Sequence, residues 1–248
     1  MLLSDVIGVS GPLLELVILC LFLRKGLWRA YPLLFTYAVW LLVANSVLLT
    51  TSLYFPRVHP SYYWNIDSID VVLRFVVVWE IFHQIFPKNS GLNKTLSKGL
   101  AMVALGLIVF ACATFLIYQN YTGPRSVHLA LDRSFGFIQA IMILGTLLMA
   151  RYYGVQCGRN VRGIALAFGG WVSISTATNA MADLAVSFIP YWYYLRPLSF
   201  VVMMAVWIWA LWVYEPNPPI PEGESAELNQ WTEDWNRTIS TARTIIRS

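Results

Sequence analysis

The sequence predicts an all-α membrane protein: a seven-transmembrane-helix bundle with its N-terminus outside, its C-terminus cytoplasmic, and an amphipathic C-terminal helix. Three observations predict this fold. First, 58% of the 248 residues are hydrophobic and only 12% are charged, whereas about a quarter are charged in soluble domains. Second, seven apolar segments are long enough to cross a bilayer. Third, Lys and Arg residues are concentrated in alternate connections between these segments.

Each of the seven segments contains about 20 mostly apolar residues, which is the length that crosses the hydrocarbon core. The first segment does not read as a signal peptide, because Asp5 precedes it and Arg24, Lys25 and Arg29 follow it. The spans are expected at Val6–Leu23, Pro32–Leu53, Asp67–Phe86, Leu100–Tyr118, Leu131–Ala150, Gly163–Ile189 and Leu195–Tyr214.

The direction of the chain follows from the positions of its 17 Lys and Arg residues. One set of connections and the tail carry most of them, whereas the opposite connections carry only Arg57 and Arg125. Because cytoplasmic loops are enriched in Lys and Arg, the basic set marks the cytoplasmic side. The basic set is Arg24, Lys25, Arg29, Lys88, Lys94, Lys98, Arg151, Arg159, Arg162, Arg237, Arg243 and Arg247.

Two regions are expected: a transmembrane domain over residues 1–214 and a cytoplasmic tail over residues 215–248. A proline spacer at 216–221 opens the tail, and an amphipathic helix is expected at about 225–247. Its apolar stripe must cover a surface, which is either the bilayer or underside of the bundle, or a partner protein. The stripe includes Leu228, Trp231, Trp235 and Ile239.

Charged and polar side chains gather near the outer ends of four spans. Asp67, Asp70 and Arg74 share one face of the third span, because steps of three and four residues return to one side of a helix. They are expected to converge with groups of the fifth, sixth and seventh spans, either as an ion-pair network or as an outward-facing pocket in which Arg binds an anion. The other members are Asp132, Arg133, Asn179, Asp183 and Arg196. Arg133 is expected to form a salt bridge with one aspartate, either Asp70 or Asp183.

Two further polar groups lie within the spans. Glu80, His83 and Gln84 lie toward the cytoplasmic end of the third span, where a Glu–His pair could relay a proton or a neighbour could hold the carboxylate. Glu15 lies near the middle of the first span, and Asn45 of the second span is expected at the same depth as its partner. This pair could also form a proton or cation site.

Several function classes lack the residues that they need. The seventh span has no Lys for a retinal Schiff base, and of the three His residues only His83 lies inside a span. Cys20, Cys112 and Cys157 match no metal-site or disulfide spacing. No catalytic motif is present. We therefore expect no metal, no cofactor, no nucleic-acid partner and no enzymatic activity.

Four short stretches carry a family resemblance. They are Tyr62-Tyr63-Trp64, Trp79-Glu80-Ile81-Phe82, Leu131-Asp132-Arg133-Ser134 and the segment Gly163–Gly169. With them the chain resembles, over nearly its whole length, a family of uncharacterised bacterial seven-helix membrane proteins. The family pattern usually has Glu where this chain has Asp132. The resemblance implies the same architecture and a bacterial inner (cytoplasmic) membrane location, but the family has no assigned function to lend.

The sequence leaves three functions open. The first is a receptor-like sensor that binds a small, anionic ligand in the outer pocket and acts through a cytoplasmic partner. The second is a structural or scaffold subunit of a larger membrane complex, in which the charges only hold helices together. The third is a proton- or ion-coupled transporter that uses Glu15 and Glu80.

Overall fold

The structure of the protein, a computed structural model, describes residues 2–86, 102, 105–106, 109, 113, 124–152, 154–184, 188–215, 230, 234 and 237. Over these residues the chain is helical and has no strand, which confirms the predicted all-α class. The elements there are α1 (Leu2–Lys25), the 3₁₀ helix η1 (Leu27–Arg29), α2 (Pro32–Tyr54), α3 (His59–Ile85), α5 (Pro124–Tyr152), α6 (Arg159–Leu184) and α7 (Ile189–Trp212).

Six of the expected spans overlap these helices, but α3, α5 and α7 begin about two turns earlier than expected. Ile189, which was expected to end the sixth span, is the first residue of α7. The helices begin earlier because the apolar pattern marks only the part of a helix that can lie in the hydrocarbon core of a bilayer, and the helix continues beyond that part. Pro60 and Pro124 lie in the first turns of α3 and α5, where proline is tolerated because its missing N–H would have no partner. The expected span Leu100–Tyr118, apart from a few single positions, and nearly all of the tail helix at 225–247 lie outside the described residues.

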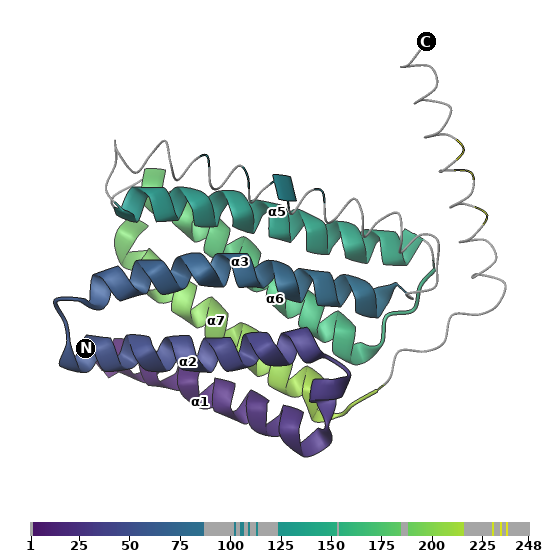
Figure 1. The fold of residues 1–248 in the computed structure, drawn as a ribbon, viewed down its shortest axis with the longest axis horizontal. Coiled ribbons are helices and arrows are strands. Elements are labelled where there is room, and N and C mark those ends of the chain that lie inside the picture. Colours follow the sequence, from purple (N-terminus) through teal and green to yellow (C-terminus); the bar gives the residue numbers. More distant parts are fainter. Residues whose placement is uncertain are drawn as a thin grey trace, which may run out of the picture.

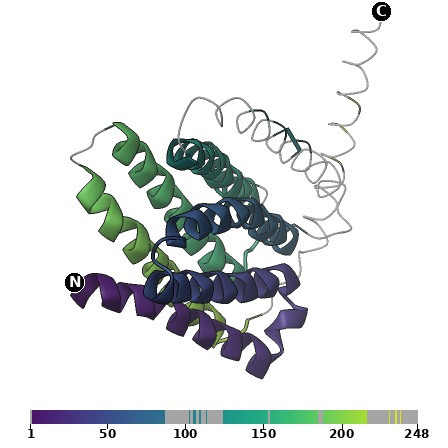
Figure 2. The same ribbon diagram turned by 60° about the vertical axis from the view of Figure 1, so that its left-hand side comes forward.

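The helices form a closed ring in the order α1, α2, α3, α5, α6 and α7, with α7 packing back against α1 (Figure 1). Helices α3 and α6 also contact each other across the ring, and the second view places α3 between α2 and α5 (Figure 2). The α1–α2 and α5–α6 connections lie at one end of the bundle. The N-terminus and the α2–α3 connection lie at the other end (Figure 1).

The turn between α1 and α2 follows from three adjacent features of the sequence. Gly26 ends α1 with a φ of 65°, a left-handed conformation that glycine adopts without steric cost. The short helix η1 then redirects the chain, and Pro32 begins α2 with its φ already suited to a helix. The buried side chains of Leu27 and Tyr31 hold this turn against the bundle.

Small residues allow close packing of α6 against its two neighbours in the ring. A Cβ added to Gly136 of α5 would overlap Thr176 Oγ1 of α6. A Cβ added to Gly163 of α6 would lie 2.8 Å from the Cβ of Ala210 on α7. The two interfaces therefore depend on glycine because no larger residue fits between the backbones.

The bundle buries charged side chains and also exposes many apolar ones. Arg74 and Asp132 are 1% and 2% exposed, whereas the apolar side chains of Leu144 and Val202 are 58% and 55% exposed. Among the described residues, three helices are long and apolar enough to cross a membrane: Pro32–Tyr54, Asp132–Tyr152 and Tyr194–Trp212. Buried charges inside a bundle with an apolar exterior are the arrangement that lipid favours.

Candidate functional site

Arg74 is the centre of a buried charge network between α3 and its neighbours. Its Nε donates a 2.9 Å hydrogen bond to Asp70 Oδ2, one turn earlier on the same helix. Its Nη2 lies 2.7 Å from the same oxygen, and its Nη1 lies 2.8 Å from Asp132 Oδ1 on α5. The guanidinium also lies 4.4 Å from the centre of the Trp171 ring on α6, a cation–π contact. Groups of three helices therefore stabilise the charge of Arg74.

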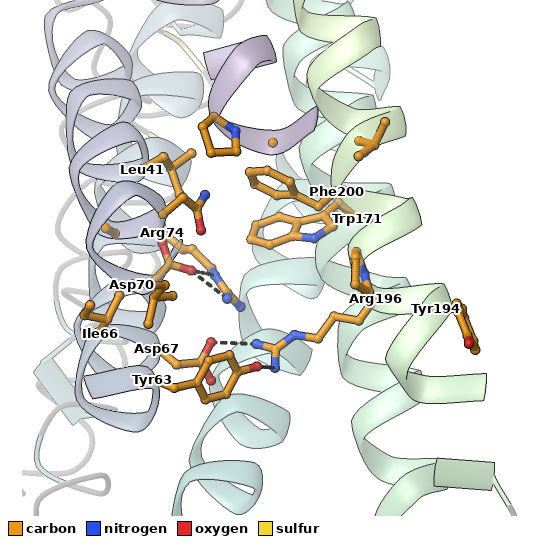
Figure 3. Close-up of a pocket in the computed structure, with 17 residues that line it drawn as sticks. Leu41, Tyr63, Ile66, Asp67, Asp70, Arg74, Trp171, Tyr194, Arg196 and Phe200 are labelled. Carbon is orange, nitrogen blue, oxygen red and sulfur yellow. Dashed lines mark hydrogen bonds and ion pairs between the residues drawn. The ribbon is translucent and has the colours of Figure 1, made fainter. Parts of the chain in front are cut away.

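Asp132 extends the network from α5 to α6 and α7. Its Oδ2 accepts a hydrogen bond from Asn179 Nδ2 and lies 3.6 Å from Arg196 Nη2. Arg196 also donates a 2.6 Å hydrogen bond to Asp67 Oδ1 and a 3.0 Å hydrogen bond to Tyr63 Oη (Figure 3). The network thus joins α3, α5, α6 and α7 at the end of the bundle opposite the α1–α2 turn.

The structure brings six of the predicted site residues into one network. They are Asp67, Asp70, Arg74, Asp132, Asn179 and Arg196. Arg133, in contrast, lines an apolar groove between α5 and α6. Asp70, one of the two aspartates that we expected beside Arg133, is bound instead to Arg74 and Tyr37. The side chain of Asp183, the other candidate, lies outside the described residues, so that contact stays a prediction.

The charge and polarity pattern of the sequence did not indicate the aromatic members of the site. Tyr37 of α2 donates a 3.0 Å hydrogen bond to Asp70 Oδ1, and Tyr63 accepts one from Arg196. Trp171 covers the guanidinium of Arg74. One signal could have indicated the role of Tyr37 in the site, namely its position at steps of three and four residues on the buried face of α2. Leu34, Ala38 and Leu41 share that face.

A cavity of about 300 Å³ lies beside the network, at the lower end of the range of about 300–1,000 Å³ in which small ligands bind. In Figure 3, Asp67, Arg74 and Arg196 extend toward one space, with the rings of Trp171 and Phe200 on its other side. Five helices contribute to its wall. Besides these five residues, polar and aromatic groups on the wall include Asn45, Tyr63, Asp70 and Tyr194.

Glu15 and Asn45 form the predicted pair between α1 and α2. Asn45 Nδ2 donates a hydrogen bond to Glu15 Oε1, and the Glu15 side chain is buried. The other oxygen of this carboxyl group, Oε2, has no hydrogen-bond partner among the described residues. Asn45 also lines the cavity, so Glu15 lies directly behind the cavity wall.

Glu80 binds the N-terminus of α2 and not a side chain. Its two carboxylate oxygens accept hydrogen bonds from the backbone N–H groups of Leu33, at 3.1 Å, and Leu34. These N–H groups belong to the first turn of α2, where they have no partner within the helix and where the helix dipole favours a negative charge. Of the two expected roles, the structure therefore supports a held carboxylate.

The two polar neighbours of Glu80 on α3 also have local partners. His83 Nδ1 lies 3.0 Å from the carbonyl oxygen of Trp79, one turn earlier, and its ring packs on the Trp79 ring. Gln84 Nε2 donates a 2.6 Å hydrogen bond to the carbonyl of Ala30 in the α1–α2 turn. Glu80 and Gln84 thus fasten this turn to α3, and the structure shows no Glu80–His83 hydrogen bond for a proton relay.

The expected surface of the tail helix cannot be placed in this site. Leu228, Trp231, Trp235 and Ile239 lie outside the described residues. Comparison of the chain with family models, with curated proteins and with solved structures gives no match. The family resemblance therefore stays a prediction, and the site must be interpreted from its own geometry.

Proposed function

We propose that this chain is a multi-pass protein of the bacterial inner membrane, with seven transmembrane helices and its N-terminus outside. The apolar exterior and the buried charges of the bundle support a membrane location. The α1–α2 connection, which includes Arg29, and the beginning of α6 at Arg159 lie at one end of the bundle (Figure 1). Under the positive-inside rule this end faces the cytoplasm, which puts the cavity near the outer face.

Within that membrane frame, the protein acts as a receptor-like sensor of a small molecule. One observation carries this proposal: the cavity is lined by both ion pairs, Asp70–Arg74 on α3 and Asp67–Arg196 between α3 and α7. A ligand in the cavity would contact the side chains that hold these helices together. Its binding energy would therefore depend on the helix arrangement, as a sensor requires. The cytoplasmic tail would carry the signal to a partner protein.

The geometry does not favour the anionic ligand that the arginines led us to expect. Arg74 is bound by Asp70 and Asp132, and Arg196 is bound by Asp67. A guanidinium that already binds carboxylates binds an anion more weakly, because the anion must compete with a paired aspartate. The proposal therefore keeps the sensor and the cavity but not the negative charge of the ligand.

Native mass spectrometry of the full chain, released from membranes in mild detergent, tests the sensor proposal. We expect a small-molecule adduct on the wild-type protein. Ala44→Trp should abolish the adduct because Ala44 is buried on the cavity wall. Val43→Trp is the matched control, since the neighbouring Val43 is 52% exposed on the outside of α2. An adduct that survives Ala44→Trp, or no adduct on any of the three proteins, would overturn the proposal.

The alternative function, a subunit of a larger membrane complex, is favoured by a second feature. An apolar groove of about 940 Å³ runs between α5 and α6, lined by residues that include Phe137, Leu144 and Gly169. A helix of another protein could pack there. Native mass spectra that show a protein partner in place of a small adduct would support this alternative.

The third function, a transporter, would have to rely on Glu15, because Glu80 is bound to α2.

A further inference from the structure

Among the described residues, the carboxylates of the charge network beside the cavity outnumber its guanidiniums. Asp67, Asp70 and Asp132 form the network with Arg74 and Arg196, so the ionised network carries one excess negative charge. Glu15 adds a further carboxyl group just behind Asn45. An excess negative charge inside a bundle is costly unless a positive group compensates it.

Asp67 is the member of the network that can accept a further partner. Its Oδ1 is bound by Arg196, whereas its Oδ2 has no hydrogen bond within the described residues. The Asp67 side chain is 14% exposed, and it lies on the cavity wall. Asp70 and Asp132, by comparison, use both of their oxygens within the network. The carboxylate oxygen without a hydrogen bond among the described residues therefore belongs to a side chain on the wall of the cavity that a ligand would fill.

Aromatic rings complete the wall around this oxygen. Tyr63, Trp171, Tyr194 and Phe200 all line the cavity, and Figure 3 shows the Tyr63 ring beside the Arg196 guanidinium and the Trp171 ring beside that of Phe200. Ring faces attract cations, and they favour an organic cation over a strongly hydrated metal ion. The indole N–H of Trp171 is buried without an acceptor among the described residues. A ligand that also carries an oxygen atom would bind more tightly, because that oxygen can accept a hydrogen bond from this N–H.

We propose that the cavity binds a small organic ammonium ion, with Asp67 Oδ2 accepting its N–H and the aromatic rings covering its alkyl groups. This inference rests on the proposed sensor function and gives its ligand a chemical class. A cation at this point restores neutrality to the network without displacing either guanidinium. An anion, in contrast, would have to break the Arg196–Asp67 pair first.

Three probes of similar size and shape, and of different charge, test this inference on the full chain in detergent. They are protonated N,N-dimethylethanolamine, the neutral 3-methylbutan-1-ol and the anionic 3-methylbutanoate. Titration calorimetry and thermal unfolding at matched ionic strength would measure binding. We expect the amine to bind at least about tenfold more tightly than the alcohol, the difference that one charge contact contributes.

Asp67→Asn should remove this preference, because an amide cannot balance the charge. Glu215→Gln is the control, since it removes an exposed carboxylate at the other end of α7. Equal or tighter binding of the alcohol or the carboxylate, no binding of any probe, or unchanged amine binding by Asp67→Asn would each overturn the inference. The comparison of the three probes decides the question on the wild-type protein even if Asp67→Asn does not fold. Tighter binding of 3-methylbutanoate would overturn only the proposed positive charge of the ligand. The sensor proposal itself is tested separately, by the Ala44→Trp experiment.

Discussion

Arg74 Nη1 lies 2.8 Å from Asp132 Oδ1, and this pair links α3 to α5 between residues that are 58 positions apart. Both side chains are 2% exposed. If one of the two side chains is removed, water therefore cannot reach the other to solvate its charge. The atoms of this pair therefore contribute both to the stability of the bundle and to the electrostatics of the cavity.

Arg74→Met should destabilise the protein by about 3–5 kcal/mol, because it leaves Asp70 and Asp132 buried without their cation. The double variant Arg74→Met/Asp132→Asn should lose less than the sum of the single variants, since one orphaned carboxylate is gone. Unfolding by SDS in mixed micelles measures both. As a control, Arg159→Gln breaks a half-exposed pair with Glu215 at 3.7 Å and should cost about 0–1 kcal/mol. Equal losses for Arg74→Met and Arg159→Gln would contradict the network.

Glu80→Gln should loosen the first turn of α2. The amide has one accepting oxygen where the carboxylate has two, and it lacks the charge that the helix N-terminus favours. We expect a loss of about 1–2 kcal/mol and faster hydrogen exchange at the N–H groups of Leu33 and Leu34. His83→Gln is the control because His83 bonds only within α3 in the described structure. Unchanged protection of these two N–H groups would show that Glu80 does not hold α2.

Asn160 at the start of α6 binds the C-terminal end of α7, a role that the sequence did not indicate. Its Nδ2 donates to the carbonyls of Ala210 and, at 2.9 Å, Val213, and its Oδ1 accepts the N–H of Glu215 at 2.7 Å. Asn160→Leu fits a similar volume but leaves these backbone groups unpaired. We expect it to cost about 1–3 kcal/mol in thermal unfolding. A variant as stable as wild type would mean that water replaces the side chain.

Gly136→Ala should destabilise the α5–α6 interface by about 1–3 kcal/mol, since its Cβ would overlap Thr176 Oγ1. Thr176→Ala should partly restore the stability of Gly136→Ala by removing the atom that is overlapped. Gly145→Ala on the same helix has open space around its Cβ, and it should be neutral or stabilising by up to about 1 kcal/mol. If the two glycine variants unfold at the same temperature, the close approach of α5 and α6 is wrong.

The orientation of the chain can be tested with a reporter that is active only outside the cell. A fusion at Pro60, in the first turn of α3, should be active, and a fusion after Tyr214 should be silent. These positions lie at the two opposite ends of the bundle, at the beginning of α3 and just beyond α7. The reverse pattern of activity would place the cavity on the cytoplasmic side and would remove the route by which an external ligand reaches it.

The sequence predicted those parts of the site that depend on local periodicity. Asp67, Asp70 and Arg74 lie on one face of α3 because steps of three and four residues fix that face within any helix. The pairing of Glu15 with Asn45 also followed, since two polar groups at the same depth in adjacent spans have few other partners. The helical class itself followed from composition and apolar length.

The rest depended on contacts that periodicity does not encode. Tyr37 and Trp171 carry single polar atoms on large apolar rings, and in a chain with 11 Trp and 13 Tyr nothing distinguishes them from packing residues. The partner of Glu80 is a pair of backbone N–H groups, which leave no mark in the sequence. That Asp132 and not its neighbour Arg133 meets Arg74 depends on how α5 is rotated in the ring.

Helix α3 connects the two ends of the bundle mechanically. Asp67 at the cavity and Glu80 at the first turn of α2 lie on one continuous helix, about 20 Å apart along its axis. Between them α3 contains neither glycine nor proline, the residues at which helices bend. A shift of α3 at Asp67 would therefore move Glu80 and Gln84, which are hydrogen-bonded to the first turn of α2 and to the α1–α2 turn. Motion at the cavity would reach the opposite end of the bundle without any helix having to unfold.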